Sequence, residues 1–286
     1  MTNGLISSVW KEGNGMTKSP DSFYKKIAEA AEFLKLDFSA EDMASFAQKN
    51  EINNDSLRSI MELFTYLKDT KQKNIVRTLL KLSRLPLKNP KAFEDFDFGR
   101  FHGKQADELE SLPTLSALYS STNLALIGPQ GIGKTHLAMA FGRECCIHGL
   151  KTYFLKATEL NQKLLQARKD GNVERVVKSL VKPSCLIIDE IGYCNFDMEN
   201  TRIFFDIVDR RYSKDMPNTM IVTSNVEPDK WVTFFADEPA LKCAMDRFFD
   251  KALLISMKGK SYRGGCRRMI EVIAGNGLIP NLEKND

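Results

Sequence analysis

LIGPQGIGKTHLA, residues 126–138, contains the pattern G-x-x-x-x-G-K-T between an apolar segment and a segment typical of a helix. Glycines allow the turns that aim consecutive backbone N–H groups at phosphate oxygens, and the N-terminus of the following helix adds a favourable dipole. The residues expected to bind the phosphates of a nucleotide are Gly128, Pro129, Gln130, Gly131, Ile132, Gly133, Lys134 and Thr135. Lys134 is expected to neutralise the β- and γ-phosphates, and Thr135 to coordinate Mg²⁺.

The residues around this loop alternate between strand and helix patterns. Apolar segments that predict strands cover residues 123–127, 152–155, 185–189, 219–224 and 253–257, and helical segments cover residues 134–146 and 201–211. Continuous apolar strands separated by helices favour an α/β fold, in which helices cover both faces of a parallel sheet. Ligand sites in such a fold lie at the carboxyl ends of the strands.

An acidic pair ends one of these predicted strands, in the stretch CLIIDEIG at residues 185–192. Asp189 has the position of a carboxylate that orients the water shell of Mg²⁺. Glu190 follows it and is a candidate general base that polarises water for attack on the γ-phosphate. Two acidic residues after a strand can also cap a helix, but the nucleotide loop already found favours the catalytic interpretation.

Two further candidates lie downstream. IVTSN, residues 221–225, ends a strand in short polar side chains, and Asn225 is either a turn residue or the amide that holds the attacking water or the γ-phosphate. ALKCAMDRFFD, residues 240–250, predicts a helix on which Arg247 is either a solvated residue or an arginine finger. A finger would reach across a subunit interface and stabilise transition-state charge at the neighbour's γ-phosphate.

The N-terminal part of the chain is helical and ends in a basic segment. Residues 20–85 carry helical periodicity that places Ile60, Leu63, Phe64 and Leu67 on one apolar face, with the capping signal SAED at 39–42 and prolines at 86 and 90 that end the last helix. Residues 71–91 include seven Lys or Arg and no acidic residue. This segment is either a solvated helix face or a contact with a phosphate backbone. Candidate contacts are Lys73, Arg77, Lys81 and Arg84, together with Lys163, Arg168, Lys169, Arg175 and Lys178 after the second predicted strand.

Composition limits the classes of protein that fit. The 286 residues carry a formal charge of +4, so attraction to a polyanion must come from local basic clusters. No stretch approaches the roughly 20 apolar residues of a membrane span, and none suits a signal peptide, so we expect a cytoplasmic protein. The six cysteines and three histidines lack metal-ligand spacing. The chain also lacks the NKxD of GTPases and the LSGGQ of transporter ATPases, and THLA after the loop disfavours a small-molecule kinase.

The order of the motifs GPQGIGKT, LIIDEIGY, DRRY, TSN, MDRFF and KGKSYRG resembles that of AAA+ ATPases of the IstB and DnaC type, over about residues 22–264. The stretches RLPLKNPKAFEDFDF and DKWVTFFADEPALKCAMDRF are most similar to IstB-like helper proteins of insertion-sequence transposition. The resemblance implies an AAA+ P-loop NTPase core, in which a parallel sheet is flanked by helices and the helical lid is reduced or absent. A small all-helical N-terminal domain is expected to precede this core.

We therefore expect a disordered N-terminus over residues 1–19, a helical domain over 20–90, a linker over 91–111, the ATPase core over 112–264 and a C-terminal tail over 265–286. The aromatic and acidic linker sequence AFEDFDFGRFHG is expected to pack onto the core. Little chain remains after Arg263 for a lid, so Arg263 itself is a candidate to replace the arginine that a lid would supply.

The resemblance also implies ATP and Mg²⁺ as cofactors, hydrolysis with Asp189 and Glu190, sensing by Asn225, and an interface role for Arg247 in a homo-oligomer. The expected partners are duplex DNA, bound without strong sequence preference, and a cognate transposase. The connection IVDRRYSKDMPNT is longer than in helper proteins and is similar to that of replicative helicase loaders, so a DnaC-like loader stays open. A DNA-binding switch with little turnover is less favoured, because Glu190 and Arg247 are both present.

Overall fold

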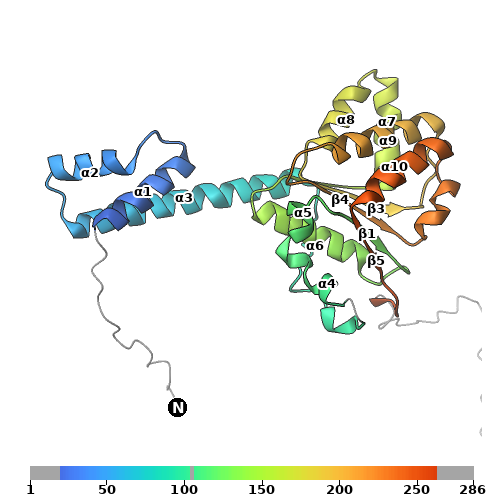
Figure 1. Cartoon of the computed structure of the whole chain (residues 1–286), viewed down its shortest axis with the longest axis horizontal. Helices are drawn as coiled ribbons and strands as arrows, with labels where there is room; N and C mark the ends of the chain where they lie inside the picture. The colour runs from blue at the N-terminus through green and yellow to red at the C-terminus, as the bar shows by residue number, and fades with distance from the viewer. Residues whose placement is uncertain (1–19, 104–105, 263–286) are drawn as a thin grey trace, which may run out of the picture. The chain divides into compact units, whose positions relative to one another are not determined.

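The computed structural model describes residues 20–103 and 106–262, which are drawn in colour in Figure 1. The expected disordered N-terminus, the predicted tail and Arg263 lie outside the described residues. The chain divides into two compact units, Met1–Leu82 with Cys146–Gly149, and Ser83–Cys145 with Leu150–Asp286. None of the helices in the described ranges has the length and apolar character that a membrane crossing requires.

Helices α1 (Pro20–Leu34), α2 (Ala40–Lys49) and α3 (Asn54–Leu82) form the described N-terminal part of the first unit. The predicted capping signal before α2 is confirmed, because Ser39 Oγ accepts a hydrogen bond from the Asp42 backbone N–H at 3.1 Å and Asp42 accepts one from the Ser39 N–H at 2.8 Å. The core of this unit contains Ile27, Met43, Ala47 and Leu57.

The predicted apolar face of α3 is covered only in part. Ile60 and Phe64 pack against the core, as the helical period indicates. Leu63 and Leu67 are 55% and 41% exposed, so the expectation that they face the same core is wrong. The reason is the direction in which these side chains point: α1 reaches as far along α3 as Lys71, whose Nζ donates to the Phe33 carbonyl at 2.8 Å, but it covers only the face that carries Ile60 and Phe64.

The second unit is built on a parallel sheet in the order β2-β3-β4-β1-β5. Its strands are β1 (Asn123–Ile127), β2 (Thr152–Lys156), β3 (Cys185–Ile191), β4 (Thr219–Ser224) and β5 (Ala252–Ser256). The long helices are α6 (Lys134–Ile147), α7 (Ala157–Lys169), α8 (Val173–Val181), α9 (Met198–Tyr212) and α10 (Glu238–Asp250). Short helical segments are η1 (Phe98–Arg100), α4 (Ala106–Glu110), η2 (Leu112–Thr114), α5 (Ser116–Tyr119) and η3 (Pro228–Thr233).

Helices cover both faces of this sheet (Figure 1). Alternate residues of each strand point to opposite sides, so Leu124 and Leu126 join the core beneath α6, while Ala125 and Ile127 join the core beneath α7, α9 and α10. The predicted parallel sheet with helices on both faces is confirmed. The expected packing of the aromatic linker is also present, because Phe93 and Phe96 are buried in the core on the α6 side.

Candidate functional site

The phosphate loop follows β1 directly and opens α6. Gly128 has a φ of +151°, and a Cβ atom there would lie 2.2 Å from the carbonyl oxygen of Met257, which follows β5. Gly133 has a φ of +109°, and a Cβ atom there would lie 2.7 Å from Cε2 of Phe96. The loop therefore needs glycine at these two positions, both for backbone conformation and for close packing against the linker and the end of β5.

Lys134 and Asn225 lie in direct contact. The Lys134 side chain is 6% exposed, and its Nζ donates hydrogen bonds to the carbonyl oxygens of Gly128 and Pro129 at 2.7 and 2.8 Å and to Asn225 Oδ1 at 2.7 Å. The Asn225 amide also donates a short hydrogen bond to the hydroxyl of Tyr193. The loop after β1 and the end of β4 thus bring together an ammonium group and an amide.

Thr135 and Asp189, the two predicted Mg²⁺ ligands, also meet. Asp189 Oδ1 accepts hydrogen bonds from Thr135 Oγ1 at 2.8 Å and from Thr223 Oγ1 at 2.6 Å. A hydroxyl and a carboxylate are the oxygen ligands that Mg²⁺ takes beside nucleotide phosphates, so the residues fit the ion. Burial raises the pKa of Asp189, although the two hydroxyl donors act in the opposite direction.

We expect the Mg²⁺-dependent gain in nucleotide affinity to decline as the pH falls, starting at a higher pH than an ordinary aspartate would give. The raised pKa of Asp189 is the reason, since a carboxyl that takes up a proton earlier loses the charge that attracts the ion. Thr223→Val removes a donor that favours the ionised form, so it should move the decline to a still higher pH.

Nucleotide affinity measured with and without Mg²⁺ between about pH 5 and pH 8 checks this expectation. The exposed Thr233 supplies the matched control, because Thr233→Val makes the same chemical change away from the carboxylate. Identical pH profiles for Thr223→Val and the unchanged protein would contradict the assignment of Asp189 to the ion.

Glu190 is held by its backbone and by an ion pair. Its φ is +64°, which is uncommon for a residue other than glycine, and its N–H donates to Thr223 Oγ1 at 3.0 Å. Its carboxylate lies 2.9 Å from Nζ of Lys156, the last residue of β2. The hydrogen bond to Glu190 raises the pKa of Lys156, so this lysine stays charged. Thr223 therefore contacts both acidic residues and orients them. In the stretch TSN only Asn225 was singled out from the sequence, and this role of Thr223 was not predicted.

A cavity of about 590 Å³ adjoins the phosphate loop and receives side chains that the sequence did not indicate. The residues that line it include Pro86 and Asn89, which precede the linker, the linker residues Lys91, Asp95, Phe96 and Asp97, and His136, Met139, Tyr193 and Tyr262 from other elements. The ring of Phe96 stacks on Phe101 with centroids 5.6 Å apart, and Tyr262 lies 6.4 Å from it. The aromatic residues of the linker sequence could have indicated this cavity. They were predicted only to pack onto the core, and not to line a cavity beside the phosphate loop.

Arg247 lies at the other end of the sheet. It lines a second cavity with Asn123, the first residue of β1, and Met220, the second residue of β4. Its Nε lies 2.5 Å from Asp209 Oδ1, and its Cζ is 5.0 Å from the centre of the Phe205 ring. Five strand residues at about 3.3 Å each separate the two ends of β1, so Arg247 is not brought to the phosphate loop of its own chain.

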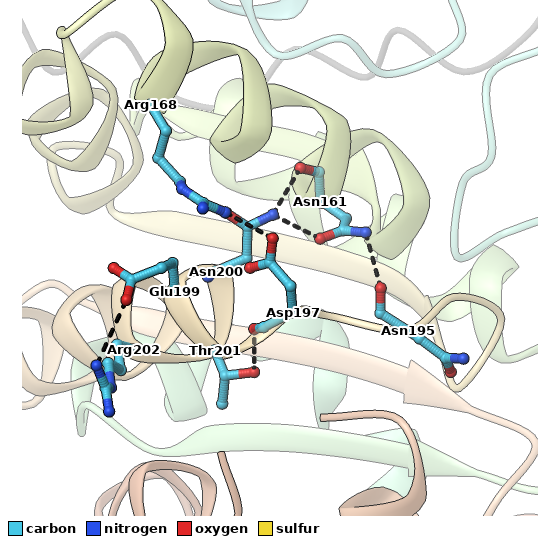
Figure 2. Close-up of polar contacts among 8 residues, drawn as sticks. All are labelled: Asn161, Arg168, Asn195, Asp197, Glu199, Asn200, Thr201 and Arg202. Atoms are coloured by element: carbon cyan, nitrogen blue, oxygen red, sulfur yellow. Dashed lines mark hydrogen bonds and ion pairs between the residues drawn. The ribbon is translucent and has the colours of Figure 1, made fainter. Parts of the chain in front are cut away.

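Several candidate DNA contacts are already engaged in ion pairs. Arg168 Nη1 lies 2.6 Å from Asp197 Oδ2 and 3.3 Å from Asn200 Oδ1, in the network of Figure 2 that joins α7 to the start of α9. Arg84 pairs with Glu159 at 3.3 Å, and Lys178 pairs with Glu174 at 3.4 Å. In contrast, the side chains of Lys73, Arg77, Lys81, Lys169 and Arg175 are exposed, and Lys163 is half-buried. The predicted basic set is therefore dispersed over two units, and part of it stabilises the fold.

Similar proteins match most of the chain. Residues 28–269 match the family described as IstB-like ATP binding protein. The chain is 33% identical over 250 residues to the ATP-binding protein of insertion sequence IS5376 from Geobacillus stearothermophilus, covering 86% of this chain and 97% of the relative. It is 30% identical over 243 residues to that of IS232 from Bacillus thuringiensis, covering 84% and 94%. The crystal structure of the DnaC helicase loader is similar with a TM-score of 0.45 and 18% identity, covering 57% of this chain and 96% of that chain.

Proposed function

Because the chain belongs to the family of IstB-like ATP-binding proteins, we propose that it is an AAA+ ATPase that assembles on duplex DNA and presents this target to a transposase. ATP drives assembly, and hydrolysis resets the protein. The observation that carries the proposal is the convergence of Lys134, Asp189 and Asn225 at the carboxyl edge of one parallel sheet, beside a glycine-rich loop.

The ATP cycle divides among a few side chains. Lys134 exchanges its carbonyl and amide partners for the β- and γ-phosphates, which releases Asn225 to hold the γ-phosphate or the attacking water. Thr135 and Asp189 hold Mg²⁺, which supplies charge neutralisation at the phosphates when bound. Glu190 accepts the proton of the attacking water. The aromatic side chains Phe96 and Tyr262 offer the base an apolar surface in the adjoining cavity.

The position of Arg247 supports assembly into an oligomer. An arginine at the amino ends of the strands is remote from its own phosphate loop, but a head-to-tail contact would bring it to the loop of the next subunit. Asp209 and Phe205 fix the guanidinium from two sides, so the cation is held in one orientation before the neighbour arrives. We infer that Arg247 stabilises the transition state on the neighbouring subunit.

Duplex DNA is the proposed partner of the exposed basic residues on α3. Lys73, Arg77 and Lys81 recur every four residues on this helix and are exposed, so they form one row on its surface. Such a row can neutralise successive phosphates without reading bases, which fits a target chosen without strong sequence preference. Arg84 is not included, because its guanidinium pairs with Glu159.

We expect binding of this protein to duplex DNA to require ATP and to weaken steeply with salt. Each phosphate neutralised contributes a log–log slope of about −0.9, so replacing Lys73, Arg77 and Lys81 by Gln should flatten the slope by up to about 2.7. Replacement of the exposed Lys25, Lys26 and Lys49 by Gln removes the same charge from the same unit and should leave the slope nearly unchanged. Fluorescence anisotropy across a salt series, with a non-hydrolysable ATP analogue, provides the measurement.

The same measurement on single-stranded DNA separates the helper from a helicase loader. A helper prefers duplex and co-purifies with a transposase, whereas a loader prefers single strands and captures a hexameric helicase. Preference for single strands together with helicase capture would overturn the proposed role in transposition. The assignments at the ATP site would be unaffected by that result.

A further inference from the structure

Tyr193 is an aromatic residue beside the ATP site, and the ATP cycle described above gives it no role. It follows β3 by two residues and is 50% exposed, so burial of its ring does not explain its position. It lines the cavity of about 590 Å³ together with Lys134, Glu190 and Asn225. A half-exposed side chain on a loop among such groups is more often used in function than in packing.

The turn that carries Tyr193 is anchored on both sides of this residue. Before it, the carbonyl oxygen of Ile191 accepts a hydrogen bond at 2.7 Å from Oγ of Ser224, which directly precedes Asn225. After it, the carbonyl oxygen of Asn195 accepts one at 2.9 Å from Nδ2 of Asn161 on α7 (Figure 2). The backbone of the turn is therefore fixed both to the end of β4 and to α7, and it places Tyr193 without burying the ring.

The contacts of the Asn225 amide determine which of its two ends carries the oxygen. Lys134 can only donate, so the atom that lies 2.7 Å from its Nζ must be Oδ1. The other end of the amide is then Nδ2, which donates to the hydroxyl oxygen of Tyr193. Asn225 is exposed, so these two contacts at opposite ends of a planar group, and not close packing, hold the amide in one orientation.

Binding of ATP removes one of these two contacts. The Lys134 ammonium group has three N–H donors, and its acceptors include the carbonyl oxygens of Gly128 and Pro129 and Oδ1 of Asn225. When this group turns to the phosphates, the oxygen end of the amide loses its donor. Among the described residues, Tyr193 is then the hydrogen-bond partner that the Asn225 side chain keeps. Without it, rotation by 180° would exchange the positions of the amide oxygen and nitrogen.

We propose that Tyr193 is a positioning residue for hydrolysis: its hydroxyl holds Nδ2 of Asn225, so that Oδ1 stays where it can accept a hydrogen bond from the attacking water. Water is a donor there and needs the oxygen end of the amide, whereas an amide rotated by 180° would present a second donor. Fixing a group in its productive orientation before the reaction lowers the barrier of the step that uses it. The inference rests on the proposed function, because it requires Asn225 to act in ATP hydrolysis.

The first experiment removes only the hydroxyl, with Tyr193→Phe in the full chain. Single-turnover hydrolysis at saturating ATP should become about five to ten times slower, which corresponds to the loss of one hydrogen bond. The affinity for a non-hydrolysable ATP analogue should stay unchanged, because the ring still lines the cavity. Tyr119→Phe makes the same change on α5, where Tyr119 is 51% exposed, and should hydrolyse ATP at the normal rate. A rate for Tyr193→Phe equal to that of this control would overturn the proposal.

The second experiment is a double-mutant cycle with Asn225→Ala, measured by the same single-turnover assay. If Tyr193 acts through the amide, Tyr193→Phe causes no further loss in the Asn225→Ala protein, because alanine leaves no amide to orient. Two effects that multiply, or a fall in nucleotide affinity that matches the fall in rate, would show that Tyr193 acts on the nucleotide directly and would overturn the proposal. These outcomes concern Tyr193 alone, whereas an unchanged protein that does not hydrolyse ATP would overturn the proposed function itself.

Discussion

Glu190→Gln is expected to bind ATP with nearly unchanged affinity and to hydrolyse it about 10²–10⁴ times more slowly, which is the usual contribution of a general base. The amide keeps the size of the carboxylate but cannot accept the proton of the attacking water. Because Glu190 lies 2.9 Å from Lys156 and its backbone is held by Thr223, the substitution leaves polar partners that an amide can still satisfy. Single-turnover hydrolysis, measured at saturating ATP, isolates this step.

Two companion variants sharpen the result. Lys134→Ala should lose nucleotide binding itself, because it removes the ammonium group that lies among Gly128, Pro129 and Asn225. Glu227→Gln makes the same change as Glu190→Gln at an exposed position and should hydrolyse ATP normally. Hydrolysis by Glu190→Gln at the rate of the unchanged protein would show that the general-base assignment is wrong.

The parts of the site that the sequence predicted are those encoded within a few residues. The phosphate loop needs its own glycines, its lysine and the start of its own helix, and all of these lie between residues 128 and 135. Asp189 and Asn225 were predicted as site residues because each comes at the end of an apolar segment and parallel strands share a carboxyl edge. In the structure Asp189 lies two residues before the end of β3, and Asn225 directly follows β4. Their contacts with Thr135 and Lys134 follow from that topology.

The parts that the sequence did not predict depend on pairings between distant segments. Phe96 reaches the phosphate loop from the linker, more than thirty residues earlier in the chain, and Lys156 reaches Glu190 from the end of β2. Arg168 was a candidate DNA contact because a basic residue in an amphipathic helix usually faces solvent. Its partner Asp197 is 29 residues away in sequence, so only the packing of α7 against the start of α9 reveals the ion pair (Figure 2).

Arg211 was not singled out in the sequence, although helical periodicity could have identified it as a buried residue. It follows Phe204 and Ile207 by seven and four residues on α9, which puts it on the buried face of that helix. Arg210, its neighbour in the DRRY motif, faces the other way and pairs with Glu174 at 2.9 Å. The helical period therefore distinguishes the buried Arg211 from the surface residue Arg210. It gives no information on the second cavity, which Arg211 also lines.

Arg247→Ala is expected to reduce ATP turnover by about 10³-fold or more, which is the usual effect of losing an arginine finger. The decisive result comes from mixing it with Lys134→Ala, which has an intact Arg247 but an inactive loop. In a head-to-tail oligomer assembled at random from equal amounts, about one interface in four combines an intact finger with an intact loop, so turnover should recover to about a quarter of the normal level. ATPase activity across mixing ratios, with subunit exchange verified by labelled chains, provides the measurement.

The control replaces Lys134→Ala by the double variant Lys134→Ala with Arg247→Ala, which supplies no finger and should restore no ATPase activity. If mixed oligomers form and activity stays at the level of that control, Arg247 acts within its own subunit or only supports the fold through Asp209.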